Sequence, residues 1–430
     1  MSAILRTEVT GYWHRIRQFS PNAQKLIISN FTRAFGWGIT QTLFNLYLIS
    51  LGYSNAFLGG LMSLNAMSMA ISSIVVGIYV TRVGPKYSLI VGMMISVTVG
   101  FNQVAFPVPE VLLITAVLGG LGVALLNVSF SPFITRSSTS YERTHLFGTS
   151  QSAMILSSFL ANTLAGFLPG FFSLYYALPF DSSPTFQMAL FIHVIPLILS
   201  ILPLLIIRET EAPPPNNNSQ FTHKTVKPVA TKDVGKLALR FGIVNIFIGL
   251  GAGFVIPYLT IFFWEFYDLP TPVVGLVQGL GSLSVALGVF LSPVLSTRIG
   301  KVKTVIVTQG LSLPFLFFIA SIINPFVAIT SYIFRVVLMN ASSPVDTTLR
   351  MELVPEYFQP TMSAISGFAW NFPWALSTLV TGPLFDLQLY LIPFWFTLTC
   401  YSTSTVLYAA FFWNIEKKQQ KIQTTETHTK

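Results

Sequence analysis

Charge is scarce in this chain: 9% of its 430 residues are Asp, Glu, Lys or Arg, whereas 52% are hydrophobic. Soluble globular domains carry about 25% charged residues, so the composition excludes an ordinary soluble protein. Cysteine is scarcer still. Cys400 is the single cysteine, which excludes a disulfide framework within the chain and a cysteine-based metal cluster.

The residues of common catalytic and cofactor sites are also missing. The five histidines and one cysteine do not assemble a nucleophile, a general base and an orienting partner. No metal-ligand spacing and no phosphate-binding Gly-Lys-Ser/Thr loop occurs. We therefore expect no enzyme activity, no metal and no cofactor.

What the chain has instead is long apolar runs, with a mean hydropathy of +0.67. A hydrocarbon core of about 30 Å needs roughly 20 apolar residues per helical crossing, and continuously apolar runs favour helices over a β-barrel. The sequence thus predicts an all-α membrane protein with twelve transmembrane helices. They lie near 26–51, 56–80, 87–106, 111–133, 147–173, 185–207, 239–264, 273–296, 303–323, 325–345, 358–384 and 389–414.

The charges sort by predicted side of the membrane. With the N-terminus inside, every Lys and Arg except Arg33 and Arg335 lies in an inner loop, a tail or an adjoining helix end, as the positive-inside rule requires. Five acids fall outside: Glu110, Asp181, Glu265, Asp268 and Asp386. The net charge of +9 therefore indicates membrane topology and not nucleic-acid binding. We expect a multi-pass protein of a plasma or bacterial inner membrane with both termini cytoplasmic.

The chain divides six helices plus six. The stretch after the sixth helix is polar, contains three prolines followed by three asparagines, and reads as a flexible inner linker. The predicted organisation is a cytoplasmic tail at 1–25, a six-helix bundle at 26–207, a linker at 208–237, a second six-helix bundle at 238–414 and a cytoplasmic tail at 415–430.

The two halves repeat one pattern. Thr81-Arg82-x-Gly84 is echoed by Thr297-Arg298-x-Gly300, 216 positions later, and basic residues follow both copies. Further echoes at offsets of 211 to 216 are Gly59 with Gly275, Tyr47 with Tyr258, Asn127 with Asn340, Pro132 with Pro344, Arg136 with Arg350 and Glu142 with Glu356. Parallel six-helix repeats joined by an inner linker predict two pseudo-symmetric bundles with a binding site between them.

These features together resemble the major facilitator superfamily over residues 26–414. The family's loop signature after the second helix is Gly-x-x-x-Asp-Arg-x-Gly-Arg-Lys. Gly77, Arg82, Gly84 and Lys86 match it, whereas Thr81 replaces the acid and Pro85 the first basic residue. The resemblance implies an inner gate whose partners change as the halves rock. Its predicted residues are Gly77, Arg82, Gly84, Lys86, Arg298, Gly300 and Lys303. The alternative is that these basic residues only hold the loops inside.

Arg33 and Arg335 are charges within predicted spans, where a charge costs at least about 2.5 kcal/mol. Arg33, Trp37, Gln41 and Asn45 follow at intervals of four and share one helix face. On the tenth helix Ser331, Arg335, Ser342 and Asp346 form a comparable stripe. The resemblance implies that both stripes face the cavity, and arginines without paired acids favour an anionic or carbonyl-rich substrate. The alternative for each arginine is a structural role.

Other candidates are less specific. Trp370 and Asn371 on the eleventh helix suit an amphipathic ligand or ordinary packing. His193, Glu110 and Asp346 are the candidates for proton coupling, and uniport stays open. Gly166-x-x-Pro169-Gly170 is partly similar to the antiporter signature of the superfamily's exporters and does not decide direction.

The first hypothesis for function is a secondary transporter that moves a small organic solute by alternating access, with proton-coupled export as its first form. We expect a small-molecule substrate, the lipid bilayer and protons as partners, no nucleic acid, and a monomer. The rival hypothesis is a transporter-like sensor or scaffold that binds a ligand without moving it.

Overall fold

The computed structural model describes residues 19–137, 140–207 and 234–428, and within these ranges every regular element is a helix. The first half of the chain, here called the N-half, contributes six long helices. They are α2 (Pro21–Ser50), α3 (Asn55–Val83), α4 (Pro85–Ala105), α5 (Pro109–Ser137), α6 (Ser140–Tyr176) and α7 (Ser183–Ile206).

The second half, the C-half, contributes six more spans. The first of them is composite: α8 (Val234–Val255) continues through η2 (Ile256–Tyr258), α9 (Leu259–Ile261) and the π-helix η3 (Phe262–Phe266). The others are α10 (Thr271–Ile299), α11 (Lys301–Ser321), α12 (Pro325–Leu353), α13 (Gln359–Asp386), which the short η4 (Glu356–Phe358) precedes, and α14 (Ile392–His428).

Every predicted span corresponds to one of these helices. Nine spans within the described residues are long and apolar enough to cross a membrane, and α2, α13 and α14 fall outside that group. On α3 the side chains of Ile71, Ile74 and Ile78 are exposed on the surface of the bundle. Lipid is the solvent that such a surface suits, since soluble monomers rarely expose large apolar patches. The fold is therefore the predicted all-α membrane bundle.

Several helices are longer than their apolar runs predicted. α12 ends at Leu353, where the apolar run predicted 345, and α14 continues to His428 although 415–430 was expected to be an unstructured polar tail. α8 begins at Val234, so the last residues of the expected linker are helical, and Val234 and Leu237 are buried. A helix does not have to end at the lipid boundary, because water can solvate its next turns. Positions 1–18 of the expected N-terminal tail and 208–233 of the linker lie outside the described residues.

Local signals fix where helices begin. The Ser20 hydroxyl accepts a hydrogen bond from the Ala23 N–H at 3.3 Å, and Ser54 does the same for Phe57 at 3.2 Å. Asn324 caps α12 by accepting from two backbone N–H groups. Such caps satisfy donors that have no partner in the first turn of a helix.

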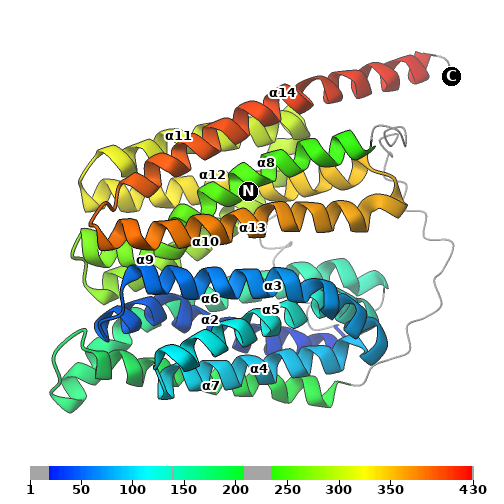
Figure 1. Cartoon of the computed structure of the whole chain (residues 1–430). Coiled ribbons are helices and arrows are strands. Elements are labelled where there is room, and N and C mark those ends of the chain that lie inside the picture. The colour runs from blue at the N-terminus through cyan, green and yellow to red at the C-terminus, as the bar shows by residue number, and fades with distance from the viewer. Residues whose placement is uncertain (1–18, 138–139, 208–233, 429–430) are drawn as a thin grey trace, which may run out of the picture.

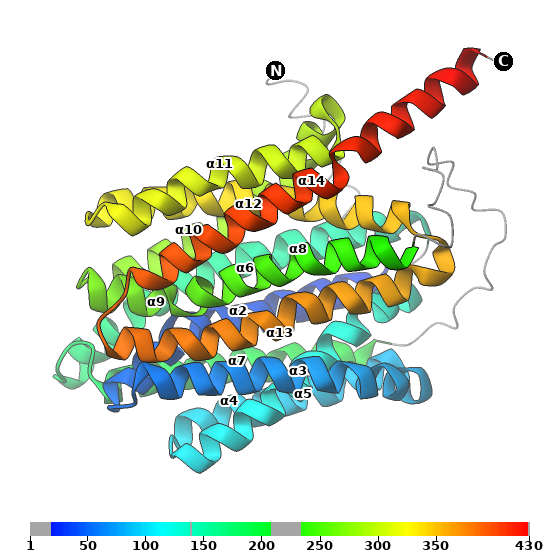
Figure 2. The same cartoon turned by 45° about the horizontal axis from the view of Figure 1, so that its top comes forward.

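The two halves form two layers of the bundle. Figure 1 shows α2–α7 below and α8–α14 above, with α3 and α13 side by side where the layers meet. In the turned view α3 and α13 again lie side by side, and α14 projects beyond the bundle at the C-terminus (Figure 2). α6 against α10 is the second large contact between the halves.

Small residues allow these helices to meet closely, as is typical of membrane bundles. A Cβ atom added to Gly59 of α3 would lie 2.3 Å from the Tyr258 hydroxyl, and one added to Gly275 of α10 would lie 2.7 Å from the Asn162 carbonyl oxygen. Gly59 and Gly275 are echoes of each other in the sequence repeat. The repeat therefore encodes both contacts between the halves.

The bundle has two chemically different ends. Asp181, Asp268 and Asp386 lie at the end that we call acidic, which is the predicted outer side. Arg82 and Arg298 lie at the other, basic end, beside the tight turns at Gly84 and Gly300. The φ values of these two glycines are +94° and +89°, a region that residues with a side chain rarely adopt.

Candidate functional site

A large cavity lined by described residues has a volume of about 430 Å³ and lies mainly in the C-half. Its wall comes from α8, α10, α11, α12, α13 and α14, and among the described residues Gln41 is the one contribution from the N-half. It extends from Gly281 and Tyr332 in mid-bundle to Arg350, in the last turn of α12 at the basic end. The volume lies within the range of small-molecule sites, roughly 300–1,000 Å³.

Arg335 of α12 is the central charge of this wall. It is 4% exposed, its Nη2 donates a hydrogen bond to the Tyr401 hydroxyl at 3.0 Å, and its guanidinium carbon lies 5.4 Å from the centre of the Tyr401 ring. No carboxylate of the described residues forms an ion pair with it. A buried cation held by a neutral hydroxyl and a ring face leaves charge to offer to a ligand.

A second charged group lies nearer the basic end. Asp346 and Arg350, one turn apart on α12, form an ion pair, and the Arg350 guanidinium also lies 5.7 Å from the centre of the Phe241 ring. Both side chains are mostly buried, at 17% and 11% exposed. Together with Arg335, the described residues of the wall include two arginines and one carboxylate, which gives this part of the wall an excess of one positive charge.

The structure brings only part of the predicted site together. Gln41, Arg335, Trp370 and Asp346 line the cavity. Asn45 instead donates to the Pro257 carbonyl at 3.1 Å and so joins the two halves. Trp37 and Asn371 make surface or local contacts, and Arg33 lies elsewhere in the N-half.

Trp37 and Asn371 are two predicted site residues that lie outside the cavity wall. Trp37 is 54% exposed and is absent from the cavity wall. Asn371 donates to the Gly367 carbonyl of its own helix at 2.9 Å. A stripe with a spacing of four residues turns gradually around its helix, so the α2 stripe reaches the cavity at one member, Gln41.

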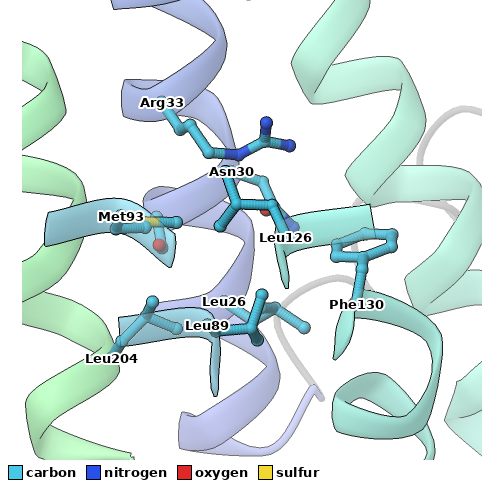
Figure 3. Close-up of a pocket in the computed structure, with 9 residues that line it drawn as sticks. Leu26, Asn30, Arg33, Leu89, Met93, Leu126, Phe130 and Leu204 are labelled. Atoms are coloured by element: carbon cyan, nitrogen blue, oxygen red, sulfur yellow. The ribbon is translucent and has the colours of Figure 1, made fainter. Parts of the chain in front are cut away.

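Arg33 lies beside a different and much smaller cavity, of about 10 Å³. Figure 3 shows Leu26, Leu89 and Leu204 below it, with the Arg33 guanidinium turned away from these leucines. Its Nη2 lies 3.8 Å from the Met154 sulfur, and the neighbouring Asn30 donates to the Ser150 hydroxyl at 2.8 Å. A space of this size holds at most about one water molecule, so it is not an organic ligand site.

The acidic end is closed by contacts between the halves. The Asp386 carboxylate, at the end of α13, accepts from the Asn55 N–H at 2.7 Å and the Ala56 N–H at 2.9 Å. These N–H groups belong to the first turn of α3, where the helix dipole favours negative charge. Asp386 of the C-half thus caps a helix of the N-half.

The repeat provides the reciprocal contact. Asp181, which follows α6 of the N-half, accepts a hydrogen bond from the Thr271 hydroxyl at the start of α10 in the C-half. Burial raises the pKa of the Asp181 carboxyl, and hydrogen bonds from Thr271 and Trp264 partly oppose that rise. Each half therefore places an acid on the N-terminus of the other half's second helix.

Glu265 extends the contact between Asp386 and α3 into a larger polar cluster. Its carboxylate accepts from the Tyr390 hydroxyl at 3.1 Å and from the Asn55 side-chain amide at 3.5 Å. Burial, followed by the charges of Glu265 and Asp386, raises the pKa of Tyr390 to about 12. The Tyr390 hydroxyl consequently remains a donor at neutral pH.

In the part of the chain that the structure describes, the basic end is not joined in this way. Among hydrogen bonds and ion pairs between described residues, those that join the halves lie in mid-bundle or at the acidic end. Arg82, Arg298 and Lys303 of the predicted gate are exposed, and Gly77 has open space where a side chain would be. Lys86 donates to the Ile207 carbonyl at 2.6 Å, within its own half.

The three predicted proton-coupling groups lie far apart in the fold. His193 is 2% exposed in the N-half, hydrogen-bonded to the Leu190 carbonyl and packed on Gly100. Glu110 is exposed in the first turn of α5. Asp346 alone of the three lines the cavity.

Sequence reasoning missed the part that Asp181 and Asp386 play. Both were used only to assign the outer side, although each follows the fifth helix of its half, and that parallel position was the available signal. It also missed Gln309 of the wall, and it left Asn245 open between a ligand and a neighbouring helix. An amide in an apolar run more often bonds a neighbouring helix, so the sequence offered no signal that separates these two uses.

Comparisons with known proteins agree with this architecture. The family model described as Major Facilitator Superfamily matches residues 26–378. No curated protein matches the chain. Among solved structures, a mutant of the nucleoside transporter NupG is 14% identical, with a TM-score of 0.71 and coverage of 91% of this chain and 100% of that one.

Two further structures have the same fold. A bacterial homologue of the human lysosomal transporter Spinster, in an inward-facing and unoccupied conformation, is 13% identical with a TM-score of 0.68, covering 93% of this chain and 97% of its own. A D-xylose-proton symporter is 15% identical with a TM-score of 0.69, covering 90% and 96%. These likenesses establish the fold, and the family model extends over most of the chain. The chain belongs to the Major Facilitator Superfamily and is a membrane transporter, not an enzyme.

Proposed function

We propose that this protein is a secondary transporter that moves a small anionic organic solute by alternating access, with the C-half cavity as its binding site. The observation that carries the proposal is Arg335, a buried cation in the wall of a ligand-sized cavity that has no carboxylate partner among the described residues. Such a charge is costly within a membrane unless it has a function or a compensating partner. A carboxylate or phosphate on the solute supplies that partner.

The two ends of the bundle support the alternating-access part of the proposal. Contacts between the halves hold the acidic end closed, whereas the cavity extends toward the basic end. We take this conformation as inward-facing, with the basic end and both termini on the cytoplasmic side of a cell membrane. Arg82, Arg298, Lys86 and Lys303 then form the inner gate when the halves rock to the opposite state.

Proton coupling and export are the finer parts of the proposal. Asp346 is the preferred coupling group because, of the three predicted groups, it lines the cavity and neighbours a cation, Arg350. Proton binding to Asp346 would release Arg350 for the solute or for another partner. Flux with and without a pH gradient, in Asp346→Asn and in the wild type, tests this step.

The transport proposal is tested in proteoliposomes with solute on one side only. A transporter gives net flux, whereas the rival sensor or scaffold binds solute without flux. Arg335→Ala should reduce flux and binding of an anionic solute much more than those of a neutral one. Equal losses for both solutes, with a lower unfolding temperature, would assign Arg335 a structural role.

A further inference from the structure

Around Arg335 the cavity wall presents hydrogen-bond acceptors of fixed orientation. The side-chain amide of Asn245 donates to the Phe241 carbonyl at 2.8 Å, and that of Asn340 donates to the Val336 carbonyl at 2.9 Å. A backbone carbonyl can only accept, so the NH₂ group of each amide must face it. The amide oxygens of Asn245 and Asn340 therefore remain as acceptors.

The side-chain oxygen of Gln309 is also left as an acceptor, because two hydrogen bonds fix the orientation of its amide. The Ser342 hydroxyl donates its proton to the Met339 carbonyl at 2.8 Å, so its oxygen accepts from the Gln309 NH₂ group at 3.4 Å. The Gln309 oxygen is then left over, and it is buried without a partner among the described residues. One oxygen of Asp346 is in the same condition.

Unpaired buried polar atoms are costly and rare, yet several are collected around this one cavity. Besides the acceptors of Gln309 and Asp346, Nε of Arg335 and Nε of Arg350 are buried without a partner in the described part of the chain. A ligand that matches this wall thus needs two kinds of group: an anion that accepts from the arginines, and donors for the amide and carboxylate oxygens. One molecule with both kinds of group would satisfy it.

We propose that the cavity binds a small organic acid that also carries hydroxyl or ammonium donors. The acid group bonds Arg335, and the donors bond the oxygens of Asn245 and Asn340. Along α12 the rise from Arg335 to Asn340 is about 7.5 Å, which suits a chain of about six carbons. The inference rests on the proposed function, since it names the class of solute that the cavity binds.

Four six-carbon probes separate the two requirements. Gluconate carries an acid and hydroxyl donors, and 6-aminohexanoate carries an acid and an ammonium donor. Hexanoate lacks the donors, and glucose lacks the acid. Binding to the purified full-length protein is measured by titration calorimetry and by the shift in unfolding temperature. Gluconate, 6-aminohexanoate or both should bind at least about tenfold more tightly than hexanoate and glucose.

Three variants at two positions test which residues produce the preference. Arg335→Gln should reduce gluconate binding to the level of glucose, and Arg335→Lys should restore part of it because the charge returns without the planar fork. Asn340→Leu should reduce gluconate binding part of the way to the level of hexanoate, because the Asn245 oxygen remains as an acceptor. Arg240→Gln and Asn102→Leu are matched controls, because Arg240 also lies over an aromatic ring and Asn102 also bonds the carbonyl four residues earlier. Neither lines the cavity.

The outcomes distinguish this inference from the proposed transport function. Tight binding of hexanoate alone, of glucose alone, or of none of the four probes contradicts the acid-plus-donor class and leaves flux of another solute as a separate question. If ordered water is the only partner of the acceptors, gluconate and hexanoate should bind equally well. That result also contradicts the proposal. Binding of gluconate without flux would support the solute class and contradict transport.

Discussion

Removing the Asp386 carboxylate should open the acidic end. Asp386 accepts two N–H hydrogen bonds from the first turn of α3, at 2.7 and 2.9 Å, and these join the C-half to the N-half. In Asp386→Asn the amide oxygen keeps one bond, while the second bond and the interaction of the charge with the helix dipole are lost.

The magnitude follows from these two losses. A hydrogen bond to a charged group contributes about 1.5–3 kcal/mol, and a carboxylate at a helix N-terminus about 0.3–1 kcal/mol. Asp386 is exposed, so water competes for it and the lower values apply. The closed acidic end should lose about 2 kcal/mol, which lowers the ratio of closed to open molecules roughly 30-fold.

Distances between spin labels in lipid nanodiscs measure that ratio. Labels on Val108→Cys and Ile323→Cys, in a Cys400→Ala background, report on one exposed loop of each half at the acidic end. Asp386→Asn should enrich the longer-distance population. Asp268→Asn is the matched control, because Asp268 is an exposed acid at the same end with a φ of +50° that asparagine also tolerates. The same ratio in Asp386→Asn as in Asp268→Asn and wild type would refute the reasoning.

Three further predictions follow from the same contacts. Burial raises the pKa of Asp181 in the closed state, so the closed state binds the proton more tightly than a state in which Asp181 meets water. The contribution of protonated Asp181 to the stability of the closed state should be complete below pH about 4 and should be lost as pH rises through the raised pKa. This pH dependence of the label distances should disappear in Asp181→Asn. Gly59→Ala should destabilise the closed acidic end by about 1–3 kcal/mol, because its Cβ would overlap the Tyr258 hydroxyl. Gly60→Ala should leave the closed end unchanged, because Gly60 has open space around it. Equal label distances in the two variants would contradict the packing argument. Gly84→Ala should destabilise the turn between α3 and α4 by about 1–3 kcal/mol because φ is +94°, whereas Gly77→Ala, inside α3, should not lower the unfolding temperature; an unchanged unfolding temperature in both would contradict the strain argument.

The sequence predicted the architecture well because the physical signals for it are strong. Twelve apolar runs, the sorting of basic residues and the echo of Thr81–Gly84 at Thr297–Gly300 depend on composition and order alone. The pairing of Gly59 with Gly275 was also visible, and both lie where the halves touch. Helix ends such as Leu353 and His428 were not predicted, because hydropathy marks where lipid ends and not where a helix ends.

The candidate site was predicted less well, because a cavity depends on how helices rotate and pack. Gln41, Arg335, Trp370 and Asp346 line the cavity, while Arg33, which was grouped with Arg335 by residue type, lies beside a separate small cavity in the other half. The role of Asp386 required knowledge that the end of α13 meets the start of α3. That contact joins residues 330 or more positions apart, which no local pattern reports.

The central claim, that the halves rock about a cavity open at one end at a time, is tested most directly by measuring both ends of one molecule. Labels on Val83→Cys and Ile299→Cys, exposed at the basic end, complement the pair on Val108 and Ile323 at the acidic end. When Asp386→Asn lengthens the acidic-end distance, the account predicts that the basic-end distance shortens. A basic-end distance that stays constant or lengthens as well would contradict alternating access.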